Sequence, residues 1–376
     1  MTTIISGTSG LTFPDNSTQA VGFYGFKNRI INGAMVIDQR NAGASIVPAS
    51  GSFPVDRFMI QISQASKITT QQNAGGLTGS NLPTGFQKYL GVTTTTAATI
   101  GSTDYFLIRT IFEGNNTYDF NFGTANAKTI TLSFWVYSSV AGTFGGSLTN
   151  AAENRSYPFT YTVSSANTWT YITITIPGDT GGTWVGASNA ASMQINWSLG
   201  MGATYSGTAG AWAATAYLSA TGATATASTL NATFYITGVQ LEKGSTATSF
   251  DYRPYGTELM LCQRYYEKSY DIDVIPGSVS SNGYDFIYGS TDAGQNALAN
   301  IRFKVSKRAP PTVLTWTEST GTAGNWNYVR NGVSATATAT TTVSPIGTNG
   351  CRIYGSAGAA WANVAWSGQW TASSEL

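Results

Sequence analysis

Histidine is absent from this sequence of 376 residues, and cysteine occurs only twice. Without histidine the chain cannot build a Ser-His-Asp triad, a histidine metal site or the usual proton shuttle at neutral pH. The two thiols, Cys262 and Cys351, lie in different halves of the chain and show no metal-ligand spacing. We therefore expect both to be small, buried and unpaired side chains.

Charge is also scarce, since Asp, Glu, Lys and Arg make up 10% of the residues and the net charge is +1. A protein that follows a nucleic-acid backbone needs clustered Lys and Arg, so we expect no nucleic-acid partner. No apolar run approaches the ~18 residues of a membrane span, and no basic and apolar leader follows Met1, so we expect neither membrane insertion nor a signal peptide. Low charge with many small polar residues suits a surface that meets neutral polar material such as glycans.

What the sequence does contain is a series of short strand signals separated by Gly, Asn, Pro, Ser and Thr. In residues 169–176 (WTYITITI), for example, isoleucine alternates with Tyr or Thr. Many antiparallel strands and a single convincing helix predict a mainly β protein with a β-sandwich jelly roll at residues 27–256. Trp135 and Trp197 lie inside regular strands, and we expect them in the core.

The rest of the chain divides around this sandwich. Residues 1–26 are too short to fold alone and are expected to form an arm that docks onto other chains. Residues 257–270 are expected to be a linker helix, with Thr257 as its N-cap, that leads to a second, smaller β-sandwich at 271–376. Before the helix, the phase of alternation changes at Thr237-Gly238, which predicts a β-bulge.

Hydrolysis of glycans by two carboxylates remains open to a chain without histidine, because it needs only Asp or Glu ~5–9.5 Å apart. With 18 acidic residues scattered over 376 positions, we expect most of them to be turn or surface residues and the protein not to be an enzyme. The acidic candidates are Asp104, Glu113, Asp119, Asp271, Asp273, Asp285 and Asp292.

Aromatic residues form the constellation best suited to ligand binding. Trp and Tyr rings stack on the C–H faces of sugars, while a few polar groups hydrogen-bond the hydroxyls. Gly-rich segments expose aromatic rings more easily than strand interiors do; the alternatives are packing in the core or, in the last domain, at an axis between chains. The candidate glycan contacts are Trp184, Tyr205, Trp212, Trp326, Tyr328, Trp361 and Trp366.

Several segments resemble bacteriophage fibre proteins that contain a jelly roll of the carbohydrate-binding-module type. The clearest is residues 233–270, where a strand ending in VQLEKG is followed by TSFDYRP and TELMLCQRYY. Residues 10–19 (GLTFPDNSTQ) resemble the N-terminal segment of such fibres, and residues 28–40 (NRIINGAMVIDQR) the opening strand of their jelly roll. Residues 368–376 (GQWTASSEL) resemble the end of a distal domain. These motifs indicate a domain type and a virion setting, but no particular ligand.

The resemblance implies a tail fibre of the virion: a homotrimer that the arm anchors to other virion proteins and that recognises host surface polysaccharide for adsorption. Thr-rich strands with few charges also need their edges covered, which a closed symmetric oligomer achieves. Jelly rolls of this type often carry structural Ca²⁺, so the resemblance also raises a calcium site, with Asp38 and Glu242 as candidate ligands.

Three alternatives remain open. The first is a head fibre or decoration protein on the capsid, of the same build, which differs in what residues 1–26 dock against. The second is a polysaccharide depolymerase, which would shorten its substrate and lose that activity when Asp285 or Asp292 is replaced. The third is a free lectin, which would be a monomer with a dispensable arm.

Overall fold

In the computed structural model of this protein, the described residues are 26–289, 296–330, 337–356 and 364–376, together with three short strands of the N-terminal arm. Those strands form a small antiparallel sheet. Trp361 and Asp292 lie outside the described residues. The strands of the arm are β1 (Ile4–Ser6), β2 (Gly10–Thr12) and β3 (Thr18–Gln19).

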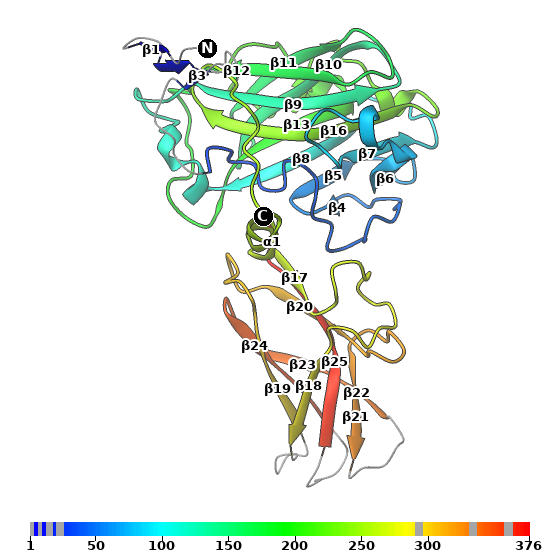
Figure 1. Ribbon diagram of the computed structural model, residues 1–376. Helices are drawn as coiled ribbons and strands as arrows, with labels where there is room; N and C mark the ends of the chain where they lie inside the picture. The colour runs from blue at the N-terminus through cyan, green and yellow to red at the C-terminus, as the bar shows by residue number, and fades with distance from the viewer. Residues whose placement is uncertain are drawn as a thin grey trace.

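Two antiparallel sheets form the larger domain, which is at the top of Figure 1. They enclose one apolar core, in which Trp197 is fully buried as expected. The six-stranded sheet contains, in spatial order, β11 (Ser156–Val163), β10 (Gly142–Asn150), β13 (Ala191–Met201), β8 (Tyr105–Glu113), β5 (Phe58–Ile62) and β4 (Ser52–Val55). The five-stranded sheet contains β12 (Thr170–Ile176), β9 (Ile130–Ser138), β16 (Thr233–Lys243), β7 (Leu90–Thr94) and β6 (Ile68–Gln72).

Short 3-10 turns and a pair of two-residue strands lie in the loops of the sandwich. The segment between β13 and β16 contributes a two-stranded parallel pair and two 3-10 turns. The short elements are η1 (Ala74–Gly76), η2 (Gly79–Asn81), η3 (Gly114–Asn116), η4 (Tyr118–Phe120), η5 (Ala203–Tyr205), β14 (Ser206–Gly207), β15 (Ser219–Ala220) and η6 (Thr226–Ser228).

One α-helix, α1 (Tyr255–Gln263), occurs among the described residues. The prediction that Thr257 caps this helix is wrong: the helix begins at Tyr255, with Pro254 at the cap position. The Glu258 amide already hydrogen-bonds the Pro254 carbonyl, so the first turn closes ahead of Thr257. No helix in the part of the chain that the structure describes has the length and apolar character needed to cross a membrane.

The smaller domain, at the bottom of Figure 1, is also a pair of packed sheets. Its central strand, β25 (Val364–Ser373), pairs with four others, namely β17 (Tyr266–Lys268), β18 (Asp285–Gly289), β20 (Thr312–Trp316) and β21 (Asn325–Arg330), and β22 (Ala337–Thr340) follows β21. The second sheet contains β19 (Asn296–Arg302), β24 (Gly350–Ser356) and β23 (Thr342–Gly347). Because β17 pairs with β25, the second half of the expected linker lies in this domain's sheet.

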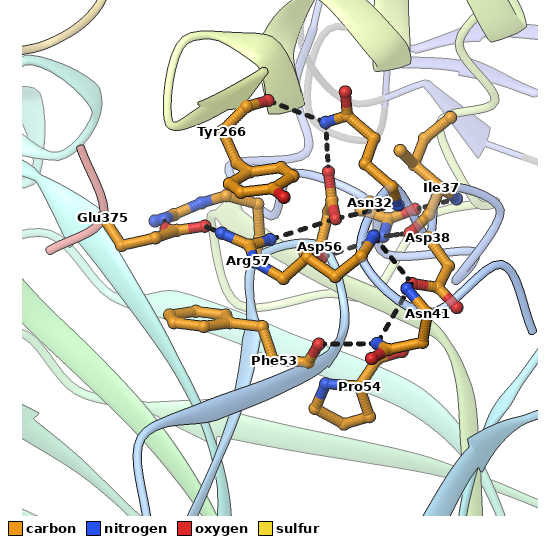
Figure 2. A network of polar contacts seen from close by, with 12 residues as sticks. Asn32, Ile37, Asp38, Asn41, Phe53, Pro54, Asp56, Arg57, Tyr266 and Glu375 are labelled. Carbon is orange, nitrogen blue, oxygen red and sulfur yellow. Dashed lines mark hydrogen bonds and ion pairs between the residues drawn. The ribbon is translucent and has the colours of Figure 1, made fainter. Parts of the chain in front are cut away.

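The end of the chain returns to the sandwich and joins the two domains (Figure 2). The Glu375 carboxylate pairs with Arg40, at 2.8 Å between Nη2 and Oε1, and also with the buried Arg57. Arg40 makes a second ion pair, at 3.1 Å, with the buried carboxylate of Asp56. We call this cluster the joint; its core members are Gln39, Arg40, Asp56, Arg57, Tyr265, Tyr266 and Glu375.

Aromatic rings from the segment after α1 stack on the guanidinium groups of the joint. The Arg40 guanidinium carbon lies 3.7 Å from the ring centre of Tyr266, and that of Arg57 lies 3.5 Å from the ring centre of Tyr265. Gln39 also donates from Nε2 to the Tyr266 carbonyl at 2.7 Å. Such cation–π contacts are strongest when they are desolvated, so the joint fixes the two domains to each other.

Candidate functional site

The outer face of the five-stranded sheet carries an open hollow with an aromatic lining. Side chains on a strand alternate between faces, and on β9 Phe134 and Val136 point into the core. Trp135 therefore points outward and is half-buried, so the prediction that it belongs to the core is wrong. Tyr171 on β12 lies directly opposite Trp135 in the ladder and is 44% exposed.

Trp135 and Tyr171 form a cross-strand aromatic pair. Their ring centres are 5.1 Å apart and the planes are inclined by 45°. Pairs of this kind are a stabilising unit of a sheet, and each ring keeps part of its surface available because the other side faces the hollow. The pair therefore presents two partly open aromatic surfaces to the hollow.

A bulge in β16 makes room beside this platform. The register between β16 and β9 shifts between Thr237 and Gln240, which confirms the predicted bulge. Gly238 has φ +62°, and a Cβ there would lie 2.7 Å from the Phe86 ring and 3.0 Å from the Trp135 ring. Only glycine suits that backbone angle and that space, so this residue keeps the hollow open.

Three further rings form the opposite wall. The ring centres of Phe86 and Phe250 are 5.0 Å apart, and Tyr252 lies 4.8 Å from Phe250 and 5.5 Å from Phe86. Tyr252 is 55% exposed. We call the resulting cavity, of about 470 Å³, the groove. Its lining residues are Thr84, Phe86, Ser133, Trp135, Tyr171, Gly238, Ala247, Thr248, Ser249, Phe250 and Tyr252.

Glu242 anchors the wall that carries Phe250 and Tyr252. Its carboxylate accepts hydrogen bonds from the Thr248 amide at 2.8 Å, from the Thr248 hydroxyl at 2.7 Å and from Gln240 Nε2 at 2.9 Å. Gln240 in turn accepts from the Asp251 amide at 2.8 Å. This network ties the loop after β16 back onto the strand, so it sets the width of the groove.

The two carboxylates suggested for calcium do not fit that ion. Glu242 is buried and surrounded by N–H and O–H donors, as described above. Asp38 is also buried and accepts from the backbone amides of Asn41 and Gly43, each at 2.8 Å, and burial raises the pKa of its carboxyl group. Ca²⁺ needs six to eight oxygen ligands, and no cluster of three or more acidic or thiol side chains exists among the described residues.

Trp184 and Trp212, two of the predicted contacts, lie together at another place on the sandwich. Trp184 meets Phe122 edge-on with ring centres 4.9 Å apart, and Trp212 meets Trp184 edge-on at 5.7 Å. The indole N–H of Trp184 donates to Asp179 at 3.0 Å, and that of Trp212 donates to the Pro177 carbonyl at 2.9 Å. Both rings are half-buried against the core, so much of their surface is used within the chain.

The other predicted contacts are dispersed. Tyr205, half-buried, meets Tyr105 edge-on at 5.9 Å and is part of neither aromatic cluster. Trp326, Tyr328 and Trp366 are buried in the core of the smaller domain, so in this chain they form no surface platform. The reason is their position in β21 and β25, whose inward faces meet the second sheet.

The acidic residues considered for hydrolysis are not gathered in the groove either. No Asp or Glu is among the residues that line it. Glu113 makes a bidentate ion pair with Arg264, in which each of the two contacts is 2.8 Å long. Asp119 pairs with Arg29 at 2.9 Å, and Asp285 accepts from the indole N–H of Trp370.

No protein family and no curated protein matches this sequence. Among solved structures, one similar chain is the enzymatically active domain of tailspike protein 4 of bacteriophage CBA120, with a TM-score of 0.33 and 10% identity; the match covers 58% of this chain but only 22% of that one. A putative sugar binding protein from Bacteroides thetaiotaomicron matches with a TM-score of 0.32 and 10% identity, over 58% of this chain and 100% of that one. A carbohydrate-binding module in complex with β-1,4-galactotriose matches with a TM-score of 0.26 and 9% identity, over 50% of this chain and 88% of that one. Such low scores assign the chain to no family.

Sequence reasoning missed the groove, although one signal for it was present. In residues 169–176 the isoleucines mark one face of the strand, which places Tyr171 on the other. The same parity argument applied to Phe134, Trp135 and Val136 predicts an outward indole. The cross-strand register that brings Trp135 opposite Tyr171, by contrast, depends on loops whose geometry the sequence does not specify.

Proposed function

We propose that this protein binds glycan in the groove on the outer face of the five-stranded sheet. The observation that carries the proposal is the pair of Trp135 and Tyr171 on the floor of an open cavity of about 470 Å³. Ligand sites combine an apolar platform with a few placed polar groups, and the groove has both. Sugar C–H faces would lie on the rings, while hydroxyl groups of the lining bind sugar hydroxyls.

Binding of this kind is reversible and breaks no bond. With no Asp or Glu among its lining residues, the groove lacks the two carboxylates of a glycoside hydrolase. We therefore propose a binding protein rather than a depolymerase. Incubation with a polysaccharide that binds should leave its chain length unchanged, and shortening of the chains would favour the enzyme.

For the biological setting we propose a fibre protein of a bacteriophage virion, in particular a tail fibre that recognises host surface polysaccharide. This proposal is supported by the resemblance of segments such as residues 233–270 to phage fibres. A homotrimer would multiply weak single sites into stable adhesion. Exposed apolar side chains on the smaller domain, including Phe286, Tyr288 and Leu314, are consistent with burial between copies.

Two measurements test the setting. Light scattering of the purified chain should give three times 39.6 kDa, and a stable monomer would favour a free lectin. Antibody labelling of virions should decorate the tail; label on the capsid would instead identify a head fibre of the same build.

A matched pair of tyrosine variants tests the groove. Tyr171 in the groove and Tyr118 on η4 are both well exposed, at 44% and 57%. We expect Tyr171→Ala to weaken glycan binding about tenfold, since it removes roughly 1.4 kcal/mol of ring contact, and Tyr118→Ala to leave it unchanged. Equal affinities of the two variants for a polysaccharide that the wild type binds would refute the groove as the site.

A further inference from the structure

The lining of the groove contains no charged residue. Its eleven lining residues include neither an acid nor a base, and none carries a side-chain amide. From this composition we infer that the groove selects uncharged saccharide chains and discriminates against acidic ones. This inference rests on the proposed glycan binding and adds the chemical class of the ligand.

Ser133 places a hydroxyl group on the floor of the groove. It is only 2% exposed, yet it lines the groove from the middle of β9. Its hydroxyl group has no hydrogen-bond partner among the described residues, and because Ser133 lines the groove this group can be reached by solvent or a ligand. A hydroxyl group can donate and accept a hydrogen bond at once. A sugar hydroxyl beside Trp135 could therefore either donate to the Ser133 hydroxyl or accept from it.

Further hydroxyl groups lie around the rim of the groove. Around the rim, Thr84, Ser249 and Tyr252 are exposed, and their hydroxyl groups are free of partners within the described residues. Together with Ser133 and Tyr171 they offer neutral hydroxyl groups, to which Trp135 adds an indole N–H. Such a lining satisfies sugar hydroxyls but offers no bidentate cation for a carboxylate, sulfate or phosphate group.

Charged residues next to the groove are engaged with the chain itself. Lys27 donates to the Thr248 hydroxyl, and Glu242 accepts from that same group at 2.7 Å. Arg253, beside Tyr252 in the sequence, pairs with Glu258 at 3.1 Å. The lining itself holds no cation, so an acidic sugar that left water for the groove would lose hydration without pairing with a lining group, which is costly.

Chemically matched polysaccharides test this selectivity. The probes are acidic bacterial surface polysaccharides that contain uronic acid, each paired with its own carboxyl-reduced form, in which the carboxylates have become alcohols, and neutral polysaccharides on the same array. We expect the wild type to bind neutral members, and to bind the carboxyl-reduced form of a pair at least about tenfold more tightly than the acidic form. Binding should also hold between about 0.05 and 0.5 M NaCl, because no ion pair contributes to it.

Two variants separate the inference from the proposed function. Tyr171→Ala should weaken the binding of neutral probes about tenfold, and Thr84→Lys, which adds a cation at the exposed rim, should raise the affinity for the acidic forms. Preference of the wild type for acidic forms, lost in Tyr171→Ala, would overturn the inference but leave the groove as the glycan site. Binding that Tyr171→Ala does not affect would overturn both the inference and the proposed function. So would the absence of binding to every probe at millimolar concentrations.

Discussion

The groove and the joint use similar side chains in opposite ways. At the joint, tyrosine rings are covered by guanidinium groups, with Arg40 over Tyr266 and Arg57 over Tyr265. In the groove, the rings of Trp135 and Tyr171 face an open cavity whose lining holds no charged residue. The tyrosine rings of the joint are therefore covered within the chain, whereas the rings on the groove floor keep an open side.

This contrast matters because the chain has few charges to distribute. Only 10% of its residues are Asp, Glu, Lys or Arg, and many of them form ion pairs that fix one segment to another. Charged side chains that are paired with each other at the joint are not available to bind a ligand.

The largest effect is expected from breaking a fully buried ion pair below the joint. Lys307 and Glu267 are both 0% exposed, and Lys307 also donates to the Gln263 carbonyl at 2.6 Å. Lys307→Met leaves the Glu267 carboxylate buried without its cation, which should lower the free energy of unfolding by about 3–5 kcal/mol. Chemical denaturation measures this loss, and glycan affinity of the folded variant should not change.

A surface pair provides the control for that prediction. Lys243 pairs with Asp119 at 3.0 Å, but its side chain is 46% exposed. We expect Lys243→Met to cost less than about 1 kcal/mol. A loss from Lys307→Met that is as small as this one would contradict the role given to buried charge.

The next largest effect is expected on binding. Trp135→Ala removes the larger ring of the groove floor and should weaken glycan binding by about 2 kcal/mol, or roughly thirtyfold. Titration calorimetry measures the affinity, and circular dichroism checks that the sandwich still folds. Unchanged affinity in a folded Trp135→Ala variant would move the site away from the groove.

The joint should also respond to pH through Asp56. Burial raises the pKa of its carboxyl group from 3.8 to about 6, against the opposing effect of Arg40. The folded protein then binds a proton between these values that the unfolded chain does not, so the stabilisation from Asp56 is complete below 3.8 and is lost as pH rises through 6.

Asp56→Asn tests this sign because the amide cannot titrate. We expect the free energy of unfolding of the wild type, relative to Asp56→Asn, to rise as the pH falls from about 7 to about 4. Asp104 is the contrasting case, since hydrogen bonds from Ser63 and Gly101 lower the pKa of its carboxyl group. Asp104→Asn should change the pH dependence in the opposite sense; the same sense for both would contradict the account.

The smallest effect is expected from Trp184→Phe. This change keeps an aromatic ring beside Phe122 but removes the indole hydrogen bond to Asp179, which is 3.0 Å long. It should cost about 1 kcal/mol of stability and leave glycan binding unchanged. A loss of binding would restore Trp184 as a ligand contact, as its Gly-rich surroundings suggested.

Much of the fold could be predicted from local patterns. Alternation along residues such as Ile172 and Ile176 indicated the strands of a sandwich, and the change of phase at Thr237-Gly238 located the bulge in β16. Both features depend on the period-2 geometry of a strand, which the sequence shows directly. The helix start was missed because Pro254, rather than a polar side chain, precedes the first turn.

The type of site could be predicted from the sequence, but its location could not. Composition indicated aromatic contacts for a neutral ligand, but glycine content proved a poor guide to which rings are open. Trp326 and Trp366 lie in a Gly-rich region of the sequence and are nevertheless buried. Phe86, Phe250 and Trp135 meet only because distant segments are brought together across the sheet, and such long-range packing has no local signature.

A crystal structure of the chain with a neutral oligosaccharide, chosen from the probes that bind, would test the central claim most directly. We expect a sugar ring lying on Trp135 and Tyr171, with a hydroxyl group hydrogen-bonded to Ser133. A sugar bound instead on Trp184 and Trp212, or on the smaller domain, with an empty groove, would contradict it.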